Sequence, residues 1–321
     1  MRLRIMTAKP VDALPVDGRM TPRVAVLIST YDGAKFLEAQ LTSLAAQTDV
    51  RLEVFARDDG SHDDTLAIMR KHASIWPRLA EPIAGENLGP AKSFLRLLVE
   101  TPGDFDYYAF CDQDDIWRPD KLSRAVARLE RDAPESPGLY CSAVRSVTED
   151  LSPIGETFRD SDARFNHLLF ENIACGVTLV MNRAARALIA DNPPVEGVIM
   201  HDWWCALVVS ALGVVVHDPE PGADYRQHHG NVVGARGGFT KLLRMLRHEP
   251  RRIYPIYVQA QEFSRLFRSS LSDENRRILD RLLHSRRSLW RRLAFAASRH
   301  VVHTRLKHAL FMRALMAAGF Y

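Results

Sequence analysis

The first third of the chain alternates between short apolar runs and segments with helical periodicity. The runs 23–30, 52–57 and 107–111 are rich in β-branched or aromatic residues, as expected of strands buried on both faces. Between them, the segments 35–47, 66–75 and 91–100 repeat apolar side chains every three or four residues, which is typical of helices packed on a sheet. Strand–helix–strand units of this kind wind right-handed. The pattern therefore predicts an α/β fold with a doubly wound, mostly parallel sheet flanked by helices, with ligands at the carboxyl ends of its strands.

The rest of the chain continues the alternation less regularly. It predicts helices over 119–132, 183–190 and 200–212, and strands over 138–143, 177–181 and 214–216. An irregular stretch of mixed polar and aromatic residues covers 152–172, and from 239 onward the pattern is helical.

Composition describes an ordinary globular protein, with 46% hydrophobic and 26% charged residues among 321. No run approaches the roughly 18 to 20 apolar residues that cross a bilayer. The segment 1–21 lacks the apolar core of a signal peptide, and we expect it to be disordered in a cytoplasmic chain. The four cysteines lie far apart in apolar surroundings, which favours buried thiols over a zinc site or disulfides.

Charge divides the chain into an acidic body and a basic tail. From Arg236 onward there are 19 Lys and Arg against 5 Asp and Glu, within a chain of net charge +4. We therefore expect one domain over 22–235 and a basic α-helical region over 236–321. Such helices could pack on the body, form an oligomer contact or lie on an anionic membrane surface, and we favour packing first and membrane contact second. No aromatic-studded RNA motif accompanies the arginines, so we expect no nucleic-acid partner.

An acidic cluster follows the apolar run 107–111. Asp112, Asp114 and Asp115 would repel one another unless they share a cation, and carboxylate oxygens suit Mg²⁺ or Mn²⁺. The alternative is a solvated acidic turn that caps the helix beginning near Pro119.

Six short motifs occur in an order that resembles family-2 glycosyltransferases, most closely the rhamnosyltransferase type that builds bacterial surface polysaccharides. The resemblance covers roughly residues 24–234, and its motifs are Ile28–Asp32, Arg57–Ser61, Asn87–Gly89, Asp112–Trp117, His201–Trp204 and Tyr225–His228. It implies a GT-A fold that binds a nucleotide-sugar and a divalent cation, Mg²⁺ or Mn²⁺, and transfers the sugar to a hydroxyl group.

The resemblance assigns the donor site to the first motifs. Thr30 and Tyr31 would lie against the base, Asp58 would accept the pyrimidine ring N–H with Asp59 in support, and Asn87 would lie beside them. An ionised carboxylate only accepts hydrogen bonds, which suits an imide N–H. The alternative is a turn in which both Asp side chains cap backbone amides.

The central and last motifs would hold the diphosphate. By resemblance, Asp112 and Asp114 serve the ribose and the metal, with Gln113 between them. His228 would complete the metal shell, although the adjacent His229 competes for this role. Arg226 and Gln227 could reach the diphosphate, because a guanidinium matches phosphate geometry.

Asp202 is the candidate catalytic base, since inversion at an anomeric carbon needs one group to accept the acceptor's proton. The predicted acceptor or sugar pocket is lined by Trp117, His201, Trp203 and Trp204. The alternative is an Asp that caps a helix whose tryptophans are merely packed.

The sequence thus predicts a metal-dependent inverting glycosyltransferase. It would move a sugar, plausibly rhamnose, from a dTDP- or UDP-sugar to a glycan or lipid-linked acceptor at the inner face of the plasma membrane. The main alternative is a nucleotide-sugar-binding or membrane-surface scaffold protein without catalysis. A nucleotidyltransferase is disfavoured because no Lys-bearing phosphate loop follows the first strand.

Overall fold

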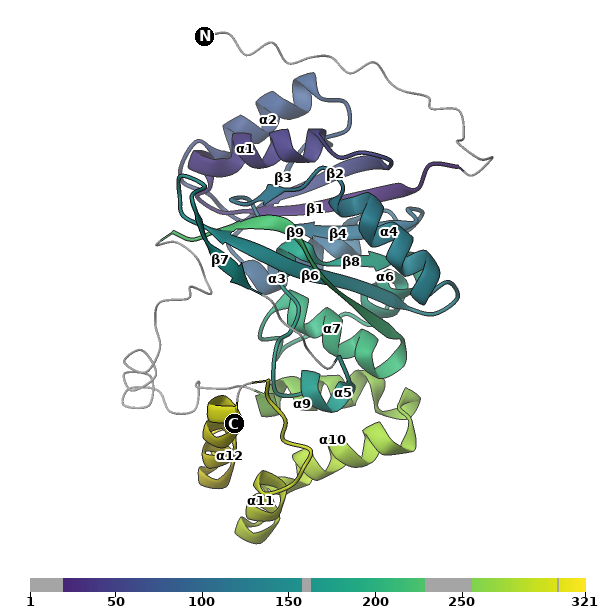
Figure 1. Cartoon of the computed structure of the whole chain (residues 1–321), viewed down its shortest axis with the longest axis vertical. Coiled ribbons are helices and arrows are strands. Elements are labelled where there is room, and N and C mark those ends of the chain that lie inside the picture. The colour runs from purple at the N-terminus through teal and green to yellow at the C-terminus, as the bar shows by residue number, and fades with distance from the viewer. Residues whose placement is uncertain (1–19, 158–162, 229–255, 305) are drawn as a thin grey trace.

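The computed structural model describes residues 20–157, 163–228, 256–304 and 306–321. Its centre is a nine-stranded sheet in the order β3-β2-β1-β4-β8-β6-β9-β5, with β7 paired to β6 (Figure 1). The first half is parallel throughout and consists of β3 (Ile83–Ala84), β2 (Arg51–Asp58), β1 (Arg23–Thr30) and β4 (Tyr107–Cys111). This half confirms the strand–helix alternation seen in the sequence.

The second half mixes directions. β8 (Val180–Asn182) runs antiparallel to both β4 and β6 (Gly138–Val147), so β4 and β6 share one direction. β9 (Val214–Arg226) is parallel to β6, while the short β5 (Ile116–Trp117) and β7 (Pro153–Thr157) are antiparallel additions. The sheet is therefore mostly parallel, as predicted.

Helices cover both faces because side chains of a buried strand alternate. On β1, Val24, Val26 and Ile28 belong to the core that includes α1 (Ala34–Ala45) and α4 (Lys121–Asp132). Ala25 and Leu27 belong to the opposite core, which includes α3 (Pro90–Glu100), α6 (Arg183–Ala190) and α7 (His201–Leu212). α2 (Thr65–Ile75) lies beside α1 at the outer end of the molecule (Figure 1).

The basic C-terminal region packs on the body, as favoured from the sequence. It contains α9 (Ile256–Phe267), η4 (Arg268–Ser270), α10 (Asp273–Ser285), α11 (Leu289–Ala296) and α12 (Leu306–Ala318). The ring of Phe263 on α9 lies 6.2 Å from that of Trp204 on α7 and 5.3 Å from that of Phe165 on α5 (Phe165–Leu168). These aromatic contacts belong to the same core as α3 and α6.

Three local predictions needed correction. The expected strand 177–181 begins as a 3₁₀ turn, η2 (Gly176–Thr178), and only its end pairs in β8. The expected strand 214–216 is far longer, because β6 and β5 pair with β9 as far as Arg226. The stretch taken as irregular contains β7 and α5.

Other expectations remain predictions. Disorder over 1–21 falls almost wholly outside the described residues, as does the position of His229, and no observation tests the boundary at residue 235. Among the helices that the structure describes, none is long and apolar enough to cross a bilayer.

Candidate active site

The carboxyl ends of β1, β2 and β4 meet at one edge of the sheet and carry polar side chains there. Thr30 ends β1 and pairs in register with Asp58 at the end of β2, while Asp112 follows the last residue of β4. Parallel strands bring their carboxyl ends together, which is why residues far apart in the sequence converge here.

Asp58 is buried at this edge and fully engaged in local hydrogen bonds. It accepts one bond from Thr30 Oγ1 at 3.1 Å and one from the Ser61 amide at 3.0 Å, and the Ser61 hydroxyl donates a third at 2.5 Å. Ser61 Oγ in turn accepts from the Asp32 amide at 3.0 Å. The turn-capping geometry of the alternative interpretation is thus present, and it fixes the carboxylate at the end of β2, in register with Thr30.

Asp59 organises the loop that leads into α3. Its two oxygens accept from the amides of Leu88 and Gly89, each at 2.9 Å, and it forms a buried ion pair with Arg57. The Arg57 guanidinium also donates to the Glu86 carbonyl at 2.8 Å and to Ser93 Oγ at 2.9 Å. The loop with Asn87 is therefore held against β2 by a charge pair, and a role for Asp59 in base binding stays a prediction.

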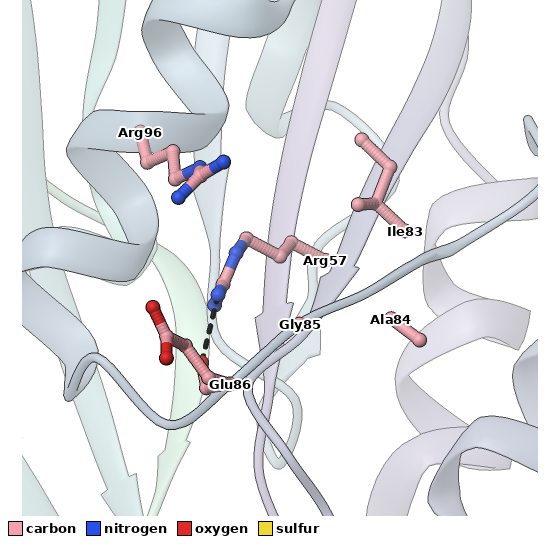
Figure 2. Close-up of a pocket in the computed structure, with 6 residues that line it drawn as sticks. All are labelled: Arg57, Ile83, Ala84, Gly85, Glu86 and Arg96. Atoms are coloured by element: carbon pink, nitrogen blue, oxygen red, sulfur yellow. Dashed lines mark hydrogen bonds between the residues drawn. The ribbon is translucent and has the colours of Figure 1, made fainter.

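A cavity of about 270 Å³ adjoins this loop on the α3 side. Figure 2 shows the Arg57 guanidinium turned towards the Glu86 carbonyl, with Arg96 on the neighbouring helix. The lining residues are Arg57, Ile83, Ala84, Gly85, Glu86 and Arg96. The charge of Arg57 is already neutralised by Asp59, so we do not assign this cavity to the donor site.

The Gln113 side chain holds the backbone of Tyr31 in place. Its amide oxygen accepts from the Tyr31 amide and its amide nitrogen donates to the Tyr31 carbonyl, both at 2.8 Å. A Cβ on Gly33 would lie 2.2 Å from the Gln113 oxygen, so only glycine allows this contact. Gln113 thus ties the end of β1 to the acidic cluster.

The acidic cluster is crowded and strained by its own charge. Loss of hydration, then the charges of Asp114 and Asp202, raise the pKa of Asp112 to about 8. Burial, then the charges of Asp114 and Asp112, raise the pKa of Asp115 well above its ordinary value. Asp115 Oδ1 accepts from the Arg226 amide at 2.9 Å, whereas its buried Oδ2 has no partner within the described ranges. A cation would relieve this repulsion.

The end of β9 closes the cluster from the other side. His228 Nε2 lies 2.7 Å from Asp114 Oδ2, and Arg226 Nε donates to the Asp114 carbonyl at 2.7 Å. The Phe36 ring supports both, with the His228 ring 4.8 Å away and the Arg226 guanidinium 4.8 Å from its centroid. A cavity of about 540 Å³ adjoins Arg226 and Phe36. Gln227 is placed differently, because its amide continues the sheet by donating to the Val147 carbonyl at 2.8 Å.

The donor set fits a hard divalent cation. Carboxylates and an imidazole are suitable ligands, and the unpartnered Asp115 oxygen and the raised pKa of Asp112 both mark uncompensated negative charge. In the present arrangement, no three His, Cys, Asp or Glu side chains of the described chain converge closely enough to hold an ion. The predicted set Asp112, Asp114 and His228 therefore stays a prediction.

Asp202 begins α7 and is held by three donors. Its Oδ1 accepts from Asn172 Nδ2 at 3.1 Å and from the Trp203 amide at 2.6 Å, and its Oδ2 accepts from the Gly176 amide at 3.0 Å. The neighbouring His201 ring lies 4.8 Å from that of Phe110 on β4, the strand that ends just before Asp112, so the start of α7 packs against the strand that carries the acidic cluster. A carboxylate fixed in this way can accept a proton.

The aromatic residues expected to line a sugar pocket are core residues in this structure. Trp204 is completely buried against Phe263 and Phe267, and Trp203 donates to the Leu168 carbonyl at 2.6 Å. His201 is stacked on Phe94 at 4.1 Å between ring centroids. Trp117 is buried under the Lys121 ammonium, 3.4 Å from the ring centroid. Their burial favours the alternative in which they are packed in the core. A role in sugar binding stays a prediction.

Sequence reasoning missed several residues that build the site. Arg57 and Ser61 lie in the same motif as Asp58 and Asp59, and this proximity in sequence could have identified them. Asn172 and Gly176 lie in a stretch without periodicity, and nothing in the sequence links them to Asp202. Only the folded chain brings them together.

Comparison with known proteins shows what the chain is similar to. Residues 25–174 match the family model described as glycosyl transferase family 2. The dTDP-rhamnosyl transferase RfbG of Shigella flexneri is 28% identical over 221 residues, which are 66% of this chain and 75% of that protein.

Two solved structures share the fold. TarS of S. aureus, in complex with UDP-GlcNAc, has a TM-score of 0.55 and 19% identity over 92% of this chain and 81% of that one. The mannosyltransferase PcManGT of Pyrobaculum calidifontis, in complex with GDP-Man and Mn²⁺, has a TM-score of 0.54 and 21% identity over 98% and 85% of the two chains. With the sheet topology, the two solved structures show that the chain has a GT-A fold, and the family match places residues 25–174 in glycosyl transferase family 2.

Proposed function

We propose that the protein is a metal-dependent inverting glycosyltransferase that transfers a sugar from a pyrimidine nucleotide-sugar to a glycan or lipid-linked hydroxyl. The observation that carries this proposal is the position of Asp202. It is anchored by three hydrogen bonds, and the adjacent His201 ring packs 4.8 Å from Phe110 on β4, the strand that leads into the Asp112–Asp114 cluster. This position supports Asp202 as a base that would act beside the carboxylates where a donor diphosphate would be bound.

The proposed reaction is a single displacement. The acceptor oxygen attacks the anomeric carbon, the bond from that carbon to the diphosphate oxygen breaks with its electron pair, and the hydroxyl proton passes to the Asp202 carboxylate. Asn172 and the amides of Gly176 and Trp203 hold the carboxylate in position, because each donates to one of its oxygens. General base catalysis of this kind typically contributes a rate factor of about 10² to 10⁴.

Asp114, with Asp112 and His228, would hold a divalent cation that neutralises the charge growing on the diphosphate. Arg226 has a separate part, because its guanidinium already bonds the Asp114 backbone and stacks near Phe36. Its fixed positive charge would attract the diphosphate to this edge of the sheet.

Asp58 and the exposed ring of Tyr31 would receive the base. Asp58 is an acceptor fixed by Thr30 and Ser61, which suits the ring N–H of uracil or thymine. The likeness to a dTDP-rhamnosyl transferase makes dTDP-rhamnose the first donor to test, with UDP-sugars second. The proposed role is bacterial surface polysaccharide synthesis, with the enzyme in the cytoplasm and in peripheral contact with the plasma membrane.

Thermal melting with Mn²⁺ and a panel of dTDP-, UDP- and GDP-sugars tests the donor site. A ligand at about 100 times its dissociation constant adds roughly 2.7 kcal/mol to the free energy of unfolding. We expect one pyrimidine nucleotide-sugar to stabilise the protein only with metal, and Asp114→Ala to lose this response. Asp120→Ala, which changes an exposed carboxylate on the same segment, is the matched control. Stabilisation that is equal in Asp114→Ala would refute the assigned metal site.

The alternative is a nucleotide-sugar-binding scaffold without catalysis. The anchored carboxylate of Asp202 argues against it, because a site released from catalysis has no need of a fixed base. Product formation from the donor identified by melting separates the two: an enzyme releases nucleoside diphosphate in the presence of acceptor, whereas a scaffold only binds the donor.

A further inference from the structure

The helices α11 and α12 carry an unusual density of exposed large apolar side chains. They lie at the end of the molecule opposite α2 (Figure 1). On α11, Trp290 is 79% exposed and Leu289 is 53% exposed, with Leu293 also exposed; on α12, Leu306 is 74% and Leu310 59% exposed. The two helices contact each other along the chain's last segment. We call these five residues the apolar end patch.

The apolar end patch is distinct from the packed face of the same helices. Leu289 and Leu293 are four residues apart, as are Leu306 and Leu310, so each pair lies on one side of its helix. Other faces of these helices are already filled: Phe295 of α11 and Met312 and Met316 of α12 belong to the buried core. The side chains of the patch therefore take no part in packing the core.

The segment of chain that carries the patch is basic. After Asp280 the chain carries nine Lys and Arg and no Asp or Glu. Arg287, Arg291, Arg299 and Lys307 are exposed, while Arg313 is used internally, where it donates to the carbonyls of Ala296 and Val301. Exposed apolar side chains on a chain segment rich in exposed cations are typical of a surface that meets anionic lipid headgroups.

We infer that the apolar end patch is a membrane-docking surface that inserts Trp290 and its leucine neighbours among anionic lipids. This deepens the proposed peripheral location and rests on the proposed function for its biological sense. A second copy of the chain is a poorer occupant, because symmetric pairing would bring two identical cationic rims together. A lipid surface offers an apolar interior for the exposed side chains and negative charge for the cations around them.

The docking end is tied to the proposed catalytic base. Between α11 and α12, the Thr304 amide donates to Glu171 Oε2 at 2.7 Å and its hydroxyl at 2.8 Å, and His303 Nδ1 lies 3.1 Å from the same oxygen. The next residue, Asn172, donates to Asp202. One short segment thus joins the surface that would meet the lipid to the base that would act on a lipid-linked hydroxyl.

Vesicle flotation and tryptophan fluorescence of the full chain test the inference. Vesicles of phosphatidylcholine alone are compared with vesicles that also contain phosphatidylglycerol. Trp117, Trp203 and Trp204 are buried and Trp76 is partly buried, so a blue shift on binding reports on Trp290. We expect binding and a blue shift only with anionic vesicles, and a partition coefficient reduced about tenfold or more in the triple variant Leu289→Ser, Trp290→Ser, Leu293→Ser.

The matched control is Ile75→Ser, which removes an equally exposed apolar side chain from α2 at the far end. Circular dichroism melting checks that both variants fold. Three outcomes overturn the inference: no binding to anionic vesicles, binding that the triple variant retains, or self-association of the wild type that the triple variant abolishes. Nucleotide-sugar melting of the same variants without lipid is expected to be unchanged, so a failed donor site and a failed docking surface give different results.

Discussion

His201 is a titratable group enclosed by aromatic rings, and its burial predicts a specific acid sensitivity. Its ring stacks on Phe94 and meets Phe110 edge-on at 4.8 Å, and neither ring nitrogen has a hydrogen-bond partner among the described residues. Loss of hydration lowers the pKa of His201 to about 4, against the weaker opposing effect of Asp202. The folded protein thus keeps the imidazole neutral where the unfolded chain protonates it.

The magnitude follows from linkage. A histidine with a pKa near 6.5 when unfolded and about 4 when folded differs by about 2.5 pKa units, which corresponds to about 3 kcal/mol. The unfolded chain binds more protons between these two values, so the free energy of unfolding rises with pH. The contribution of His201 is therefore fully favourable above pH 7 and is lost as the pH falls from about 6.5 to about 4.

The variant His201→Phe keeps an aromatic ring and removes the titration. Urea unfolding of wild type and variant at a series of pH values from 7 to 4 gives the difference in the free energy of unfolding. We expect the variant to gain about 3 kcal/mol relative to wild type over this range. The control is His62→Phe, which makes the same substitution at a largely exposed histidine. If the difference in the free energy of unfolding between wild type and His201→Phe does not change with pH, the burial of a neutral His201 is refuted.

Three further substitutions test the site. Asp202→Asn should lower turnover by a factor of about 10² to 10⁴ while donor-induced stabilisation in melting experiments is retained; unchanged turnover would exclude Asp202 as the base. Asn172→Ala removes a donor to Asp202 and should lower kcat about ten- to a hundredfold with little change in donor affinity, measured by steady-state kinetics; a purely structural role would change stability and leave kcat intact. Asp59→Ala leaves the buried Arg57 unpaired and frees two backbone amides, so urea unfolding should show a loss of about 3 to 5 kcal/mol. Asp104→Ala, which breaks an exposed pair with Arg23, is its control and should change stability little.

The part of the site at the carboxyl ends of the strands was predictable, because its residues directly end or follow buried strands. Runs such as 23–30 and 107–111 are apolar enough to identify as strands, and polar residues that end parallel strands must meet. The positions of Thr30, Asp58 and Asp112 followed from this rule. The resemblance to family 2 glycosyltransferases, confirmed by the family match, supplied the reaction class.

What the sequence could not supply depends on tertiary packing. His201, Trp203 and Trp204 share a motif with Asp202, but the contact with α9 buries Trp204 completely, and α9 lies in a different part of the chain. Asn172 reaches Asp202 across thirty positions from a stretch without periodicity. Short-range patterns carry no information about such contacts, because the partner is selected by the folded core.

The long strand β9 has a consequence for the order in which the enzyme becomes competent during synthesis. It pairs in parallel with β6 and in antiparallel with β5, and its end delivers Arg226 and His228 to Asp114. A chain emerging from the ribosome therefore exposes its acidic cluster long before the residues that close it are made. Until β9 is added, the carboxylates have neither their arginine nor their histidine, and a nucleotide-sugar would find half a site. Completion of the sheet would thus act as an assembly check on the proposed donor site.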